Sequence, residues 1–71
     1  MIRMLTKEEI ESARRIAEKE STKFIQEMID LFENMLKKET NPLVRSAASK
    51  SLEIYKMALK IRKSRSLERW L

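Results

Sequence analysis

Residues 39–48 read Glu-Thr-Asn-Pro-Leu-Val-Arg-Ser-Ala-Ala and contain the only proline of the 71-residue chain. Asn41 is a favourable N-cap residue. Pro42 suits the first position of a helix, because its φ angle is fixed and its missing N–H would have no partner there. The sequence therefore predicts a turn at residues 40–41 and a new helix from Pro42. Since a short connection makes the two flanking helices antiparallel, this stretch predicts a helical hairpin.

The helix before this turn is predicted to be long. Thr6 and Glu9 have the spacing of a capping box, and neither proline nor glycine interrupts residues 6–39. Apolar residues recur at helical spacing from Ile10 onward, which predicts one helix of about 33 residues, roughly 50 Å long. Ser21-Thr22 leaves an alternative open, because a hydroxyl residue there can cap a new helix. The alternative fold is a three-helix bundle broken at Ser21-Thr22.

The helix after the turn keeps an apolar face as far as Ile61. Beyond it, Arg62, Arg65 and Arg69 take positions that the apolar face would have used. The sequence predicts a helix over about residues 42–64, followed by a basic tail to residue 71. The antiparallel register brings Arg62 and Arg69 near Glu20, Glu18 and Glu11, so that the basic tail is partly neutralised within its own hairpin. The fold class is all-α, with residues 1–71 forming a single helical domain.

One segment has a family resemblance. Residues 41–52, Asn-Pro-Leu-Val-Arg-Ser-Ala-Ala-Ser-Lys-Ser-Leu, resemble the turn and second helix of a HEAT-type repeat. The resemblance covers residues 24–59 once and implies a helix–turn–helix hairpin at this place. A single unit of this kind cannot bury both of its faces alone.

The first helix carries more apolar surface in its second half than one partner helix covers. A stripe about 100° wide is enough for one partner, and this surface is wider. A second copy of the chain would cover the excess, so we expect a homodimer in which two hairpins form a four-helix bundle with two-fold symmetry. The predicted oligomer interface consists of Phe24, Ile25, Met28, Ile29, Leu31, Phe32, Met35 and Leu36.

Charge is divided unevenly along the chain. Residues 1–41 carry eight Lys/Arg and nine Asp/Glu, whereas residues 42–71 carry eight Lys/Arg and only two Asp/Glu. The excess positive charge therefore lies in the second half of the hairpin. An anionic partner would bind to that half.

Basic residues clustered on one helix are the electrostatic signature of phosphate binding. The sequence predicts a small regulator that binds nucleic acid with little base selectivity, or alternatively an adaptor or antagonist that docks on a larger protein. An acidic protein partner would use the same basic face. The predicted nucleic-acid-binding residues are Arg45, Lys56, Lys60, Arg62, Lys63, Arg65 and Arg69.

Composition excludes several other functions. The chain has no Cys, His or Gly, which removes the commonest general base, the best nucleophile and the usual zinc ligands. Glycine-rich phosphate loops are excluded as well. We expect no enzyme activity, no metal and no cofactor. No apolar run approaches the roughly 20 residues of a membrane span, so we expect a cytoplasmic protein; the abundance of Lys, Glu and Arg also suits a heat-adapted source.

Overall fold

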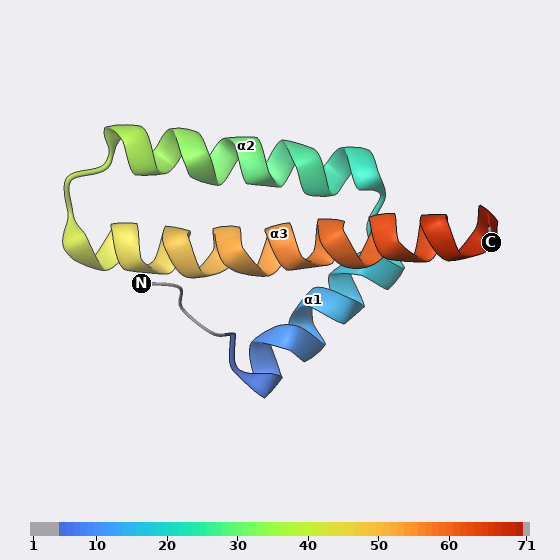
Figure 1. Ribbon diagram of the computed structural model, residues 1–71. Coiled ribbons are helices and arrows are strands. Elements are labelled where there is room, and N and C mark those ends of the chain that lie inside the picture. The colour runs from blue at the N-terminus through green and yellow to red at the C-terminus, as the bar shows by residue number, and fades with distance from the viewer. Residues whose placement is uncertain (1–4, 71) are drawn as a thin grey trace.

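The computed structural model describes residues 5–70, with side chains described for residues 5–64. It contains three helices, α1 (Lys7–Lys19), α2 (Thr22–Lys38) and α3 (Pro42–Trp70), and no strand within the described residues. The prediction of an all-α fold is confirmed (Figure 1).

The predicted unbroken helix over residues 6–39 is wrong, because the chain breaks after Lys19. Glu20 is extended, with φ −102° and ψ 150°, and Ser21 follows with φ −73° and ψ 157°. The Ser21 side chain accepts a hydrogen bond from the Phe24 N–H at 3.1 Å, so that it caps the start of α2. The break lies where the three-helix alternative has it, at the hydroxyl pair that can cap a new helix.

The start of α1 follows the sequence prediction. Thr6 is the N-cap residue, and its Oγ1 accepts a hydrogen bond from the Glu9 N–H at 3.2 Å. Glu8 and Glu9 occupy the first turn, where the helix dipole favours negative charge.

The turn between α2 and α3 is also as predicted. Asn41 Oδ1 accepts a hydrogen bond from the Leu43 N–H at 3.0 Å, and Pro42 is the first residue of α3. The Glu39 carboxylate accepts from the N–H groups of Thr40, at 3.2 Å, and Asn41, at 3.1 Å.

The predicted end of the last helix near residue 64 is wrong, because α3 continues to Trp70.

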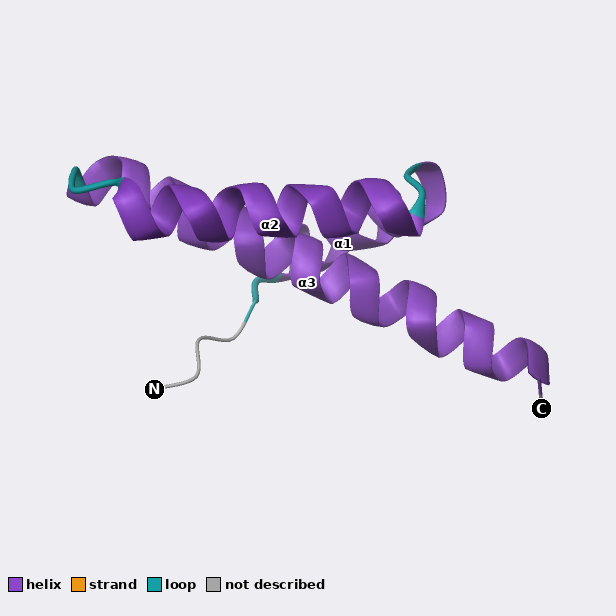
Figure 2. Cartoon of the chain, turned by 90° about the horizontal axis from the view of Figure 1, so that it is seen from above, coloured by secondary structure: helices purple, strands orange, loops and turns teal. Residues whose placement is uncertain are grey.

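The long helix α3 is the centre of the fold. α2 runs antiparallel along one side of it, while α1 crosses it obliquely on another side (Figures 1 and 2). Both α1 and α2 pack extensively on α3, whereas α1 and α2 scarcely touch each other. The 29 residues of α3 span about 43 Å, which accounts for the 45 Å long axis of the molecule.

The core is small and rich in alanine. The buried apolar residues among those described are Ala13, Ala17, Ile25, Ile29, Ala48, Leu52 and Ala58. The buried apolar residues of α1 are both alanines, Ala13 and Ala17. Their small side chains let the backbones of α1 and α3 approach closely. Against α2, the packing uses larger side chains and includes a contact between the Phe32 and Tyr55 rings, with centroids 5.7 Å apart.

Candidate functional site

Arg62, one of the predicted phosphate ligands, is partly buried and hydrogen-bonded within its own chain. Its Nη1 donates to the backbone carbonyl oxygens of Ala17, at 2.6 Å, and Glu20, at 2.9 Å. Its Nε donates to Thr22 Oγ1 at 2.9 Å. The guanidinium thus joins the end of α1, the start of α2 and the body of α3. Its Nε and Nη1 donors are used in these bonds rather than offered to a phosphate.

Arg45 and Lys56 have partners within the chain too. The Arg45 Nη1 donates to the carbonyl oxygens of Leu36 and Glu39, the latter at 3.0 Å, and so caps the C-terminal end of α2. Lys56 Nζ lies 3.7 Å from Glu33 Oε1 across the α2–α3 contact, with both side chains about half exposed. An exposed pair of this kind contributes little to stability, but it lowers the positive charge available near Lys56.

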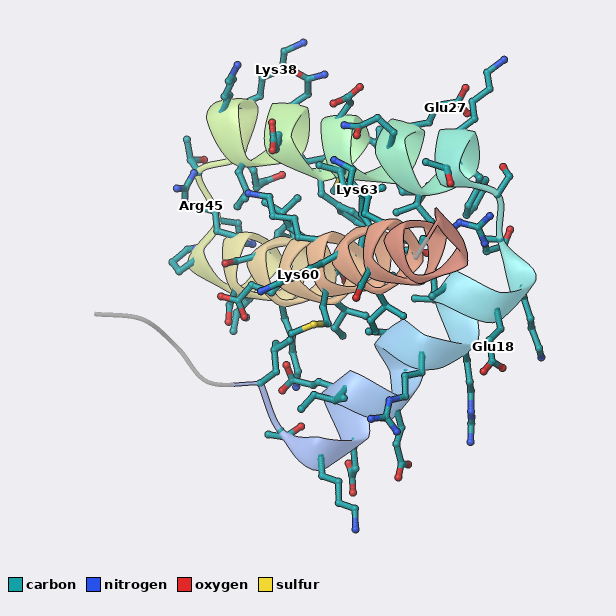
Figure 3. All side chains as sticks on the ribbon, turned by 45° about the vertical axis from the view of Figure 1, so that its right-hand side comes forward. Glu18, Glu27, Lys38, Arg45, Lys60 and Lys63 are labelled. Atoms are coloured by element: carbon teal, nitrogen blue, oxygen red, sulfur yellow. The ribbon has the colours of Figure 1, made fainter. Side chains whose placement is uncertain are left out.

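The remaining basic residues lie toward the far end of α3. Lys60 and Lys63 are exposed, and the side chains of Arg65 and Arg69 lie outside the described residues. Figure 3 shows Arg45 at the α2–α3 turn and Lys60 and Lys63 on later turns of α3. Arg45 and Lys60 are about 22 Å apart along the helix axis, so the described members of the predicted set are spread along α3.

The role of Arg62 was accessible in part from the sequence. A basic residue at a position that the apolar face would have used must either leave the core or meet a polar group there. The register correctly placed Arg62 near Glu20. What the sequence did not indicate is that the partners are backbone carbonyls, because these become unpaired only once the chain breaks at Ser21.

The eight predicted interface residues divide into two stripes on α2. The first, here called the inner stripe, consists of Ile25, Ile29, Phe32 and Leu36. Ile25 and Ile29 are buried, and Phe32 and Leu36 pack against the core. Since α3 of the same chain covers the inner stripe, a second chain would have to use the other half of the set.

The second set, here called the outer stripe, consists of Phe24, Met28, Leu31 and Met35. At 100° per residue it lies about 100° around α2 from the inner stripe. Leu31 is 50% exposed, Phe24 and Met35 are 37% exposed each, and Met28 is half-buried. At its C-terminal end the stripe borders an open hollow of about 320 Å³ lined by Leu31, Asn34, Met35, Lys38 and Glu39. The outer stripe is thus an apolar row about 16 Å long that α3 leaves partly in contact with water.

Two further findings concern the described residues as a whole. No group of three or more carboxylates in this part of the chain is arranged to hold a metal ion. None of the described helices combines the length and the hydropathy that crossing a bilayer requires.

Comparison with protein-family models, with curated proteins and with solved structures finds no match to this chain. Function is therefore inferred from the outer stripe of α2 and from the basic residues of α3.

Proposed function

We propose that the protein is a small non-enzymatic helical regulator that works by binding other protein chains through the outer stripe of α2, and that a second copy of itself is its first partner. The observation that carries this proposal is the outer stripe. Four large apolar side chains on one face of a helix are more than scattered surface hydrophobics, and such a row is typical of an interaction site.

The spacing of the outer stripe supports a helical partner. Phe24, Met28, Leu31 and Met35 follow one another at intervals of four, three and four residues, which is the seam spacing of a coiled coil. A helix packed on this seam would insert its own side chains between them.

Two-fold symmetry supports a second copy as that helix. If two α2 helices pack antiparallel about an axis between Met28 and Leu31, Phe24 faces Met35 of the partner subunit and Met28 faces Leu31 of the partner subunit. Glu27, beside the seam, then lies near Asn34 of the partner subunit, so that no like charges oppose each other there. Such an interface would join two α2–α3 hairpins into a four-helix bundle.

The test is the molar mass in solution, measured by light scattering from micromolar to millimolar protein. The wild type should become dimeric, and Leu31→Glu should dimerise far more weakly because it would bury an unpaired carboxylate in the seam. The matched control is Leu43→Glu, which changes a leucine that is 81% exposed but lies on α3, outside the stripe. A wild type that stays monomeric at millimolar concentration would refute the proposal, and so would a dimerisation constant that Leu31→Glu leaves unchanged.

A second candidate function, the binding of nucleic-acid phosphates, is supported by one observation. Lys60 and Lys63 are exposed on the half of the chain with the excess positive charge. The internal bonds of Arg45 and Arg62 weigh against it, since they leave fewer cations to contact phosphates. An acidic protein surface would be recognised by the same two lysines.

Electrophoretic retardation of duplex and single-stranded probes at low salt tests the second candidate. Each lost phosphate contact reduces the magnitude of the slope of log K against log salt by about 0.7–0.9, so Lys60→Glu/Lys63→Glu should reduce it by about 1.4–1.8. Lys37→Glu/Lys38→Glu is the matched control, because it makes the same change of charge at two exposed lysines of α2. If both double variants reduce the salt slope equally, the probe responds only to net charge and Lys60 and Lys63 are not its binding site. If the wild type does not retard the probes, the protein does not bind nucleic acid.

A further inference from the structure

The connection between α1 and α2 is a break in a sequence that is suited to continuous helix. Only Glu20 and Ser21 separate the two helices, and both are extended. No glycine or proline lies between residues 6 and 39. Straightening this connection would lose few contacts between α1 and α2, because the two helices scarcely touch.

The hydrogen bonds at the break replace those of a continuous helix. In a straight helix the Ala17 carbonyl would accept from the Ser21 N–H, and the Glu20 carbonyl from the Phe24 N–H. In this structure Arg62 donates to both of these carbonyls, and Ser21 Oγ accepts from the Phe24 N–H. The Ala17 and Glu20 carbonyls and the Phe24 N–H thus have a partner in either form, which brings the broken and the straight connection closer in energy.

Straightening would separate α1 from its own α3. A helix of 13 residues is marginal in water without tertiary packing, and Ala13 and Ala17 of α1 lie in one core cluster with Leu52 and Ala58 of α3. That face of α3 fits α1 closely because Ala13 and Ala17 allow the two backbones to approach. The α1 of a second copy has the same side chains and would fit it equally well.

We propose that the chain exchanges α1 between two copies. In the exchanged dimer, α1 and α2 form one helix over residues 7–38, about 48 Å long, and each α1 packs on the α3 of the partner subunit. Ser21 and Arg62 favour the closed form by holding the break. This exchange does not depend on the outer stripe, and either association can occur without the other.

The test uses a pair of hinge variants in a Leu31→Glu background, in which association through the outer stripe is removed. Ser21→Ala removes the N-cap of α2 and so favours the continuous helix. The loss of a cap, about 1 kcal/mol, shifts the equilibrium from the broken toward the straight connection about fivefold. With two hinges in each dimer, the dimerisation constant should rise about 25-fold. Thr22→Pro is the opposing variant: it removes the Thr22 Oγ1 that accepts from Arg62 Nε, but proline suits the first position of α2 and would break a helix over residues 7–38.

Protein refolded at millimolar and at micromolar concentration is compared by light scattering, with circular dichroism to confirm that each variant is folded. We expect more dimer with Ser21→Ala than with Leu31→Glu alone, and none with Thr22→Pro. If Thr22→Pro fails to fold, Ser21→Pro takes its place, since φ at residue 21 is −73° and Glu20 is extended before it. A Ser21→Ala protein with no more dimer than its parent, or a proline variant that dimerises equally well, would overturn the exchange of α1. Neither result would bear on the outer stripe.

Discussion

Replacing Arg62 by methionine should destabilise the protein far more than replacing either neighbouring exposed lysine. Methionine keeps most of the apolar stem, so the main loss is that of the guanidinium. The Ala17 and Glu20 carbonyls would each lose a hydrogen bond from a charged donor, worth about 1.5–3 kcal/mol. Water can reach the partly buried site after the change, so the lower value applies to each bond. The free energy of unfolding should therefore fall by about 3 kcal/mol.

This loss is large for a chain of 71 residues, whose total stability is of the order of 4–10 kcal/mol. It corresponds to a drop in melting temperature of about 12–24 °C. The assay is urea and thermal unfolding followed by circular dichroism at 222 nm, with Lys60→Met as the control that removes an exposed cation from the same helix. If Arg62→Met and Lys60→Met unfold within about 0.5 kcal/mol of each other, Arg62 does not fasten the three helices together, and the reasoning fails.

Three smaller effects should follow from the same structure. Arg45→Met should cost about 1–2 kcal/mol in urea unfolding, because it removes the donor that caps the end of α2 from an exposed position. Thr6→Ala should cost about 1 kcal/mol through the lost cap of α1, whereas Thr6→Ser should cost much less. Ala13→Leu should cost about 1–3 kcal/mol, because a residue that is 0% exposed has no room for a larger side chain; full stability in that variant would show that α1 is not closely seated on α3.

The features that local chemistry determines were predictable from the sequence. Asn41 and Pro42 specify the start of α3 through their own hydrogen-bonding groups and dihedral preferences, and the structure agrees. The same holds for Thr6 at the start of α1. Each of these signals acts over three or four residues and does not depend on a contact with a residue far away in the sequence.

The break at Ser21 could not be predicted with the same certainty, because it depends on a distant residue. Locally, residues 6–39 favour one helix, and the Ser21 cap only partly offsets that preference. The additional stabilisation comes from Arg62, some forty residues away in the sequence, and from the packing of α1 on α3. Likewise, helical periodicity identified the eight apolar residues of α2 but could not tell which half of them the chain covers itself.

The central position of α3 has a consequence for how the protein is made. Both other helices find their packing partner in the segment that the ribosome adds after them. At 5–20 residues per second, the segment from Pro42 to Arg62 takes about 1–4 s to synthesise. During that interval neither α1 nor α2 has its packing partner available from its own chain, so the three-helix arrangement forms only when synthesis has passed Arg62.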